Sequence, residues 1–438
     1  MSPLETGLLV LALMLTLMIV GVPVLFAFLG ANLVGAWLLM GGVTGLLQAI
    51  DDSVALITSF TLVAVPLFVM MGALLFRSGL ALRIFDALDA LFGRLPGRLC
   101  YLTVTGSTAF STLTGSTIAN TAMLGSLMVP EMVRRGYSPH MAIGPVVGTG
   151  GLAMLIPPSS LAVLLGSLAG INIGALLIAG LLPGLLLALL YIAQIAIQVR
   201  LDPAAAPAYD VEAVPRSRKL QLLATQVLPM GLVLAAVVAL IVRGIATQSE
   251  AAAFGVLAVA LLAAVQGCLT QRAVREALFD TVAVTATVFV LIIASSVFSQ
   301  LLAYSGLSRS AVSWILGYAS DPVLVLATMF VAVIVLGCFL DQISIMLLAV
   351  PIFFPVVKLL GIDPVWFGLL MLLALEMSLT TPPFGLLLFV MMGAAPPGTR
   401  FGTVVRAAVP YLVCNLILAV LILSLPGIAL WLPGVLLR

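Results

Sequence analysis

Charged residues are scarce in this chain. Of its 438 residues only 8% are Asp, Glu, Lys or Arg, whereas 63% are hydrophobic. Soluble domains carry about 25% charged residues, so the composition excludes a soluble protein. Apolar runs such as residues 7–20 and 251–265 are continuous rather than alternating, which excludes a β-barrel. The sequence therefore predicts an all-α polytopic protein embedded in a lipid bilayer.

Histidine, cysteine pairs and nucleotide-binding motifs are also lacking. His140 is the only histidine, and the four cysteines are scattered without CxxC spacing, so neither a metal cluster nor a disulfide framework is predicted. Residues 149–159 contain paired glycines but lack the Gly-Lys-Ser/Thr ending of a phosphate loop. We therefore expect no enzyme activity, no cofactor and no nucleic-acid partner, and we expect an ion gradient rather than ATP as the energy source.

Two short polar or Gly/Pro-rich segments interrupt the apolar sequence. The first is Gly115-Ser-Thr-Ile-Ala-Asn-Thr-Ala-Met-Leu-Gly125 and the second is Thr149-Gly-Gly-Leu-Ala-Met-Leu-Ile-Pro-Pro-Ser159. Backbone groups in hydrocarbon must satisfy their own hydrogen bonds, so a break at membrane depth is tolerated only beside protein or a watery cavity. Such breaks predict a binding site.

The same pair of interruptions occurs twice. With a shift of 225 positions five Gly or Pro residues of the first segment fall on identical residues, and Ser116 falls on Asp341. The matching residues are Pro130 and Pro355, Gly136 and Gly361, Pro139 and Pro364, Pro157 and Pro382, and Pro158 and Pro383. The chain is therefore predicted to be a duplication, with a first repeat at 1–199, a polar linker at 200–219 and a second repeat at 220–438.

Each repeat is expected to contain three crossings, a re-entrant hairpin, one broken crossing and a closing helix. In the first repeat these lie near 7–21, 24–40 and 54–76, then 99–134, 139–169 and 175–199, with a loop around Asp51 and Asp52. In the segment 77–98, Leu82, Phe85, Leu88 and Leu91 or Phe92 recur at helical spacing, so an amphipathic helix is expected that lies on the membrane rather than crossing it. Because five crossings per repeat is odd, the second repeat must be inverted, which makes ten crossings in all.

The basic residues test this topology. With the linker in the cytoplasm, fourteen of the 18 lie in cytoplasmic loops, and only Arg243, Arg309, Lys358 and Arg438 fall outside. This distribution agrees with the positive-inside rule. Both termini are then expected on the outer side of the membrane.

Half-helices that end inside a membrane suit a transport site. Their N-terminal N–H groups favour an anion such as a carboxylate, and their C-terminal carbonyls can ligate a desolvated Na⁺. Small-residue packing between helices is the alternative, but it does not explain the half-length segments or their inverted duplicate. In the first repeat the candidate substrate or ion positions are Ser116, Thr117, Asn120, Thr121, Thr149, Gly150, Gly151 and Pro157.

The second repeat places ionisable residues at the equivalent positions. Such residues at membrane depth are costly and tend to be functional. Asp341 either shapes an ion or substrate site or caps a helix end, and Glu376 either belongs to the site or pairs with a cation such as Arg77. The candidates here are Asp341, Ser344, Glu376, Thr380, Thr381 and Pro382.

Taken together, these motifs resemble the large membrane subunit of tripartite ATP-independent periplasmic (TRAP) transporters. The resemblance rests on residues 115–122, 130–137, 148–159, Phe339-Leu-Asp341 and 375–385, and it covers essentially the whole chain. It implies a Na⁺-coupled importer of organic acids in the bacterial inner membrane, served by a periplasmic solute-binding protein and a small four-helix membrane subunit, here a separate chain. It also implies an elevator mechanism, with candidate Na⁺ positions at Ser116, Asn120, Gly150, Asp341 and Thr381.

Other functions remain open at this stage. A stand-alone Na⁺/dicarboxylate or citrate symporter of the same architecture would transport without partners. A channel would give flux that is indifferent to Na⁺, and a membrane scaffold would give none. The transported acid, the Na⁺ stoichiometry and the oligomeric state do not follow from the sequence.

Overall fold

The computed structural model describes residues 2–58, 60–92, 95–114, 117–157, 159–208, 215–307, 310, 321–337, 340–382, 385–396 and 398–437. No strand occurs among these residues. By length and composition, six helices are able to cross a membrane, or eight if each of two bent pairs counts as one span. The prediction of an all-α polytopic membrane protein is confirmed. The ten expected crossings would also require apolar helices of 10–17 residues, such as Pro364–Thr380.

The first stretch of the chain forms a hairpin of two helices, which is followed by a series of separate helical segments. Ser2 caps the first helix, and its capping box with Glu5 satisfies N–H groups that have no partner within the helix. Gly79, with φ of 78°, allows a 64° bend between α4 and α5 that a side chain would oppose. The elements are α1 (Pro3–Ile19), α2 (Val24–Leu39), α3 (Val43–Ile57), η1 (Phe60–Val63), α4 (Ala64–Arg77) and α5 (Leu80–Leu91).

One sequence expectation in this stretch is wrong. Asp51 and Asp52 lie within helix α3 rather than in a loop, because α3 is amphipathic and leaves Asp51 exposed and Asp52 half-buried. Helix α5 is amphipathic, as expected: Ile84 and Phe85 are buried and Leu82 is exposed.

The first hairpin and the first broken helix follow. Serine caps start two of these short helices: Ser138 accepts a hydrogen bond at the start of α8, and Ser159 does so at the start of α10. Short caps of this kind let a helix begin inside the protein without stranded N–H groups. The elements are α6 (Arg98–Thr114), α7 (Thr117–Arg134), α8 (Pro139–Thr149), α9 (Leu152–Leu155), α10 (Ser160–Ala169) and α11 (Ile173–Leu201).

The second half contains longer helices and a second hairpin. Thr247 and Glu250 form a capping box at α14, and Asp363 caps α19, which begins with Pro364. The elements are η2 (Pro203–Ala205), α12 (Arg216–Leu222), η3 (Leu223–Val227), α13 (Leu228–Val242), α14 (Gln248–Val265), α15 (Gln271–Tyr304), α17 (Pro322–Gly337), α18 (Gln342–Leu359), α19 (Pro364–Thr380), α20 (Leu386–Ala394), α21 (Phe401–Ser424) and α22 (Gly427–Leu436).

The order of elements recurs between the halves. The hairpin α6–α7, the broken helix α8–α10 and the closing helix α11 match the hairpin α17–α18, the interrupted pair α19–α20 and helix α21. Gly136 and Gly361, which the shift of 225 positions places in register, also share left-handed backbone. The repeat boundaries and the inversion of the second repeat stay predictions.

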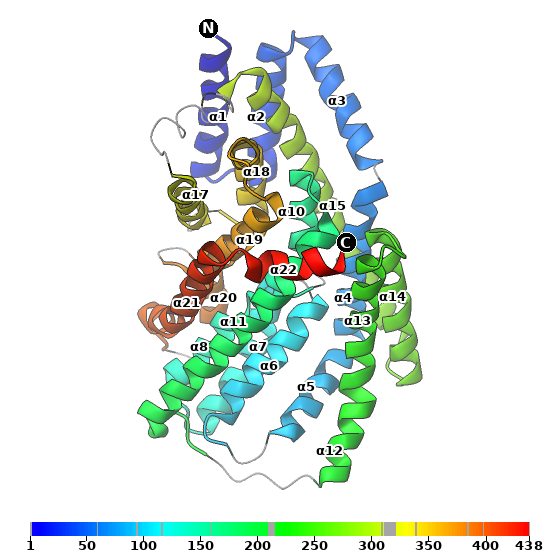
Figure 1. Ribbon diagram of the computed structural model, residues 1–438, viewed down its shortest axis with the longest axis vertical. Coiled ribbons are helices and arrows are strands. Elements are labelled where there is room, and N and C mark those ends of the chain that lie inside the picture. The colour runs from blue at the N-terminus through cyan, green and yellow to red at the C-terminus, as the bar shows by residue number, and fades with distance from the viewer. Residues whose placement is uncertain are drawn as a thin grey trace.

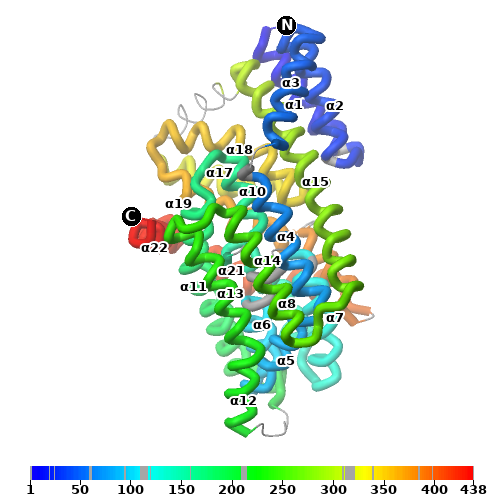
Figure 2. Tube along the Cα trace, turned by 90° about the vertical axis from the view of Figure 1, so that its right-hand side faces the viewer, coloured from blue at the N-terminus to red at the C-terminus, as the bar shows by residue number. Residues whose placement is uncertain are grey.

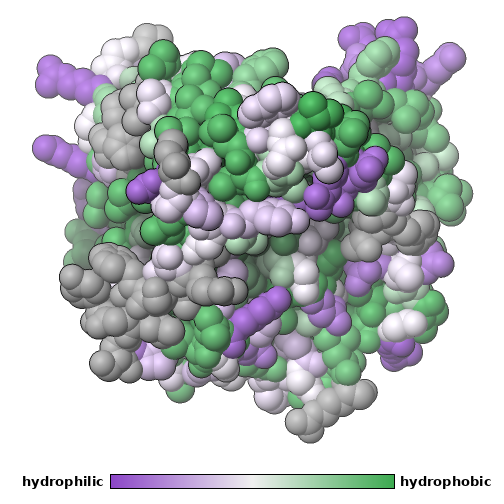
Figure 3. Space-filling model, turned by 90° about the horizontal axis from the view of Figure 1, so that it is seen from above, coloured by the Kyte–Doolittle hydropathy of each residue, from purple (hydrophilic) through white to green (hydrophobic). Residues whose placement is uncertain are grey.

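The helices divide into two groups, which we call the frame (α1, α2, α4, α14 and α15) and the centre (the hairpins and broken helices with α11, α19 and α21). Helices α14 and α15 both pack on α4, and α1 and α2 pack against α15 around Met14, Phe28 and Phe298. In Figures 1 and 2, α1, α2 and α3 lie at one end of the long axis and α5 and α12 at the other. The hairpins and broken helices lie between, with α11, α19 and α21 packed together. Apolar side chains reach the surface widely (Figure 3), as contact with lipid requires.

The closing helices α11 and α21 offer a matched pair of tyrosines for a stability test. The Tyr191 hydroxyl donates to Asn415 Oδ1 at 2.7 Å, whereas the equally buried Tyr411 hydroxyl has no partner within the described residues. We predict that Tyr191→Phe lowers the free energy of unfolding by about 1–3 kcal/mol, because it strands the amide of Asn415. Tyr411→Phe removes an unpaired group and should cost nothing. Thermal unfolding of the purified protein in detergent measures both, and equal losses would contradict the assignment.

Candidate functional site

One face of α7 carries the polar residues of the first hairpin tip. Thr117, Asn120 and Thr121 lie at positions i, i+3 and i+4, so they share a face of the helix. All three are at most 2% exposed. Helix α7 packs against α6 and α8, and this face meets the first break. Ser116 lies outside the described residues.

A chain of hydrogen bonds ties both arms of the hairpin to the first break. Asn120 Nδ2 donates to Ser107 Oγ at 2.9 Å, and Ser107 Oγ donates to the Thr149 carbonyl at 2.9 Å. The Thr149 carbonyl belongs to the last turn of α8, where helix carbonyls have no partner within the helix. Ser107 was not among the sequence candidates. No local signal singled it out, because six other Ser and Thr residues lie in the same helix.

At the first break, the backbone of a glycine lies directly against side chains of α7. A Cβ placed on Gly150 would lie 2.2 Å from Thr121 Oγ1 and 3.5 Å from Thr117 Cγ2, so only glycine allows this approach. The hydroxyl oxygens of Thr117 and Thr121 are buried and have no hydrogen-bond partner among the described residues. Buried polar atoms are normally paired. Unpaired oxygens beside helix-end carbonyls are the donor set of a hard cation such as Na⁺.

The two breaks are in contact through one side chain, that of Glu376 in α19. A Cβ on Gly151 would fall 1.3 Å from Cδ of Glu376, so the Glu376 carboxyl occupies the space that a side chain at position 151 would fill. In the predicted repeat, positions 151 and 376 are equivalent, being 225 residues apart. Equivalent positions that touch lie at the point where the two repeats meet. Two carboxylates could not both fit there.

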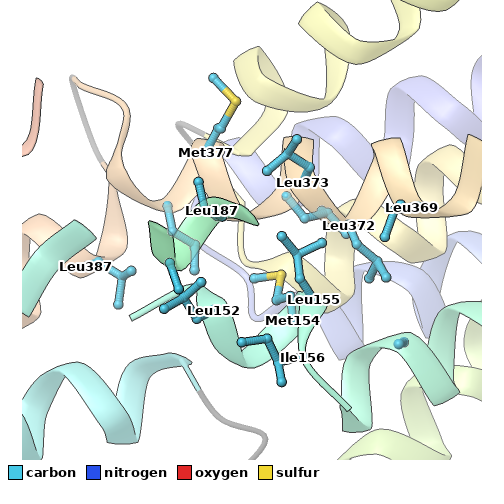
Figure 4. Packing of buried hydrophobic residues seen from close by; sticks show 14 of the residues in the cluster. Leu152, Met154, Leu155, Ile156, Leu187, Leu369, Leu372, Leu373, Met377 and Leu387 are labelled. Atoms are coloured by element: carbon cyan, nitrogen blue, oxygen red, sulfur yellow. The ribbon is translucent and has the colours of Figure 1, made fainter. Parts of the chain in front are cut away.

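Apolar side chains surround this contact. Figure 4 shows Leu152, Met154, Leu155 and Ile156 of the first break near side chains of α11 and α19 such as Leu187 and Leu373. Glu376 is fully buried, and neither of its oxygens has a partner within the described structure. A buried carboxyl of this kind is expensive unless a proton or a cation neutralises it.

The alternative pairing of Glu376 with Arg77 is wrong. Arg77 Nε lies 2.7 Å from Asp280 Oδ2, and Arg77 Nη1 lies 3.1 Å from Glu276 Oε2. These ion pairs join the end of α4 to the first turns of α15, so they fix two frame helices to each other. Glu376 is therefore not held by this cation.

At the second hairpin tip, Asp341 acts as the cap of α18. Its carboxylate accepts from the backbone N–H groups of Ile343 at 3.1 Å and Ser344 at 3.4 Å, and from the Ser344 hydroxyl. The helix-capping alternative for Asp341 thus has direct support, although Asp341 remains exposed. The buried Gln342 donates to Met154 Sδ at 3.5 Å, which places this tip beside α9.

The remaining sequence candidates play smaller parts in this arrangement. The hydroxyls of Thr380 and Thr381 turn back to the Met377 carbonyl, at 3.1 and 2.7 Å. Pro157 is buried, and Pro382 is exposed at the break after α19. The structure therefore groups Thr117, Asn120, Thr121, Thr149, Gly150, Gly151 and Glu376 at the meeting of the two breaks, whereas Asp341 and Ser344 lie at the second tip.

Both tips open onto one cavity, which we call the hairpin-tip hollow. It has a volume of about 440 Å³ and lies between α4 and α15 on one side and the tips with the start of α10 on the other. Its polar lining includes Arg77, Asp280, Thr117, Ser160, Asp341 and Gln342. The volume suits a small organic ligand. The sequence identified neither Gln342 nor Asp280, because nothing in their local pattern indicates that α15 and the second tip share a cavity.

The interrupted helices, the paired hairpins and the polar hollow between them can now be compared with known proteins. The family model described as tripartite ATP-independent periplasmic transporter, DctM component, matches residues 11–428. The chain belongs to the TRAP transporter family, as a large membrane subunit. The resemblance drawn from the sequence motifs is thereby confirmed. TRAP large subunits work with a periplasmic binding protein and a small membrane subunit.

Relatives in this family serve several substrates. The C4-dicarboxylate TRAP transporter large permease protein DctM of Pseudomonas aeruginosa is 31% identical over 86% of each chain. The sialic acid TRAP large permease SiaM of Vibrio cholerae is 31% identical over 96% of each chain, and the ectoine TRAP large permease TeaC of Halomonas elongata is 28% identical over 96% of this chain and 97% of its own.

Solved structures support the fold. The YdaH transporter of Alcanivorax borkumensis superimposes with a TM-score of 0.64 at 19% identity, covering 96% of this chain and 98% of its own. MtrF of Neisseria gonorrhoeae gives a TM-score of 0.61 at 15% identity, covering 97% and 95%. At these identities the likeness concerns the fold alone.

The contact between the breaks generates a prediction. We predict that Gly151→Ala reduces folded protein severely, because the new Cβ overlaps the buried Glu376 carboxyl. The double variant Gly151→Ala with Glu376→Ala should recover folding, with a coupling of about 1–3 kcal/mol in a double-mutant cycle. Size-exclusion profiles and thermal unfolding in detergent measure this.

The matched control is Gly393→Ala, since a Cβ at Gly393 meets nothing within 4 Å. It should leave the size-exclusion profile unchanged. A Gly151→Ala protein as stable as the parent, or a double variant no better than the single one, would contradict the contact.

Proposed function

We propose that this chain is the transport subunit of a secondary active, Na⁺-coupled importer of small organic acids in the bacterial inner membrane. It receives its substrate from a periplasmic solute-binding protein and works with a separate small four-helix membrane subunit. Membership of the TRAP family supports the three-part organisation. Relatives named for C4-dicarboxylates and sialic acid support a carboxylate as substrate.

The observation that carries the Na⁺ proposal is the group of unpaired oxygens at the first break. The Thr121 hydroxyl lies against the backbone at Gly150, close to the carbonyl end of α8, and the unpaired hydroxyl of Thr117 lies one helical turn away on α7. Hard monovalent and divalent cations take oxygen ligands of this kind, and half-helix C-terminal ends supply them in secondary transporters. Asn120 and Ser107 hold the two hairpin arms in place around the break. A second Na⁺ position beside Asp341 and Thr381 belongs to the same proposal.

The hairpin-tip hollow is the proposed substrate site. The start of α10 at Ser160 and the start of α18 at Gln342 both line it. Asp341 already occupies the first N–H groups of α18, so the start of α10 is the helix N-terminus proposed to favour the carboxylate. Because hairpins and broken helices pack as a group against α4 and α15, we propose that they move together past this frame, as in an elevator. Helix α5, bent away from α4 at Gly79, would then suspend the moving part.

Transport assays test the proposal directly. Purified chain is reconstituted into liposomes with and without a cognate small subunit and binding protein, and uptake of radiolabelled acids is measured under an inward Na⁺ gradient. Uptake that needs both partners and Na⁺ supports the proposal. Uptake by this chain alone indicates a stand-alone symporter, and saturation-free flux that is indifferent to Na⁺ indicates a channel.

Single side chains at the two tips should separate ion binding from folding. We predict that Thr121→Val, which keeps the shape but removes one unpaired oxygen, raises the Na⁺ concentration for half-maximal uptake about tenfold, equivalent to about 1.4 kcal/mol. Asp341→Ala should abolish most uptake, because it removes both a cap and a charge at the second tip.

The matched control is Thr287→Val on the exposed face of α15, where the hydroxyl bonds only to its own helix. It should leave uptake unchanged. An unaltered Na⁺ dependence in Thr121→Val would remove the first break from the Na⁺ site.

A further inference from the structure

A second cavity lies at the other end of α10. We call it the Lys358 hollow. It has a volume of about 430 Å³ and lies between the end of α10, the middle of α15 and the last turns of α18. Figures 1 and 2 both show α10 close to α15 and α18. Nothing in the sequence motifs pointed to this position.

The two hollows are separated by one helical turn of apolar side chains. On α10, Leu164 lines the hairpin-tip hollow and Leu168 lines the Lys358 hollow; on α15, Val288 and Ile292 divide in the same way. A spacing of four residues corresponds to about 6 Å along a helix. The cavities are therefore neighbours along one seam between the frame and the proposed moving part, and an apolar wall keeps them apart.

The polar groups of the Lys358 hollow are largely unused by the protein. Ser296, Ser299 and Gln300 of α15 line it and form no hydrogen bond within the described structure, and Gln300 Oε1 is buried. Their neighbour Ser295, by contrast, donates to the Leu347 carbonyl at 3.1 Å. Lys358 is exposed and has no carboxylate partner among the described residues. Hydroxyl, amide and ammonium donors thus face one cavity.

The charges of the two hollows differ in sign. Two carboxylates, Asp280 and Asp341, line the hairpin-tip hollow together with Arg77. Among its described lining residues, the Lys358 hollow has Lys358 and no carboxylate. A cavity with one ammonium and several neutral donors favours an anion. Lys358 is also one of the four basic residues that the predicted topology places outside the cytoplasmic loops.

We propose that the Lys358 hollow is a second, outer binding site for a small carboxylate, which occupies it before reaching the hairpin-tip hollow. Lys358 supplies the counter-charge, and Ser296, Ser299 and Gln300 supply hydrogen bonds. The apolar wall between the hollows then has to be displaced for the anion to pass inward, which couples passage to movement of α10 along α15. The ligand class rests on the proposed function, whereas the site itself rests on the cavity and its lining.

Lysine labelling tests the site without any transport. Lys219 and Lys358 are the only lysines in the chain, so, apart from the N-terminal amine, which peptide mapping distinguishes, a membrane-impermeant amine-acylating reagent reports on two positions. In right-side-out vesicles we expect Lys358 to be acylated from outside and Lys219 only after permeabilisation. Millimolar succinate or N-acetylneuraminate should slow acylation of Lys358 severalfold without affecting Lys219. Acylation of Lys358 from the inside only, or no protection by either acid, overturns the proposal.

Transport kinetics give the second measurement, in the complete three-part system. We expect Lys358→Gln to raise KM for the acid about tenfold with little change in kcat or in the Na⁺ dependence, and Lys358→Arg to restore most of the affinity. The control is Arg243→Gln, which removes an exposed cation on the same predicted side and does not line the hollow. An equal effect of Arg243→Gln, or an unchanged KM in Lys358→Gln, overturns the outer site.

The two measurements separate this inference from the proposed function. If the parent protein shows no Na⁺-driven uptake, the proposed function fails, and protection of Lys358 still decides whether an anion binds in the hollow. If Na⁺-driven uptake is present while Lys358 is neither protected nor needed for a low KM, the outer site fails alone.

Discussion

The rest of this structure depends on the contact between the two broken helices, where the Glu376 carboxyl lies against Gly151. These positions are equivalent in the predicted repeat, so each copy presents the same backbone break to the other. Only one of them can carry a side chain, and the copy with glycine makes room for the copy with glutamate. If the predicted duplication began with identical halves, it became asymmetric at this point. The asymmetry places one ionisable group at the centre of an apolar core.

Interrupting a helix inside a membrane leaves backbone and side-chain groups that water cannot reach. The protein pairs most of them: Ser159 and Asp341 cap new helices, and Ser107 and Asn120 cross-link the first hairpin to the end of α8. The hydroxyls of Thr117 and Thr121 and the carboxyl of Glu376 stay unpaired within the described residues. Because Thr121 and Glu376 lie against Gly150 and Gly151, and Thr117 lies one turn from Thr121 on α7, these three unpaired groups lie where the breaks meet. A cation in that place would complete the hydrogen-bonding and charge requirements that the protein leaves open.

Local patterns in the sequence were sufficient for much of the fold. Half-length apolar runs around Gly115 and Asp341 predicted the hairpins, and Gly/Pro pairs predicted the broken helices. This was possible because the point at which a helix breaks depends on residues that are neighbours in the sequence. Asp51 and Asp52 misled because an acidic pair suits the exposed edge of a helix as well as a loop. The partners of Arg77 were out of reach, since they depend on α15 packing against α4 some 200 residues later. Ser107 was missed for the same reason: its role exists only when α6, α7 and α8 converge.

The arrangement of the two hollows follows from the frame rather than from the breaks. Helix α15 runs past both cavities, and α10 has its capped start in one and its end in the other. A short helix with polar cavities at both ends and leucines between them acts as a partition. If α10 moved by one turn along α15, different residues would form the apolar wall. Leu164 and Leu168 are one turn apart on α10, and Val288 and Ile292 are one turn apart on α15. Short broken helices are suited to such movement because each is capped independently and no continuous hydrogen-bond ladder has to be broken. The breaks that form the proposed ion site would thereby also form the partition that the proposed movement needs.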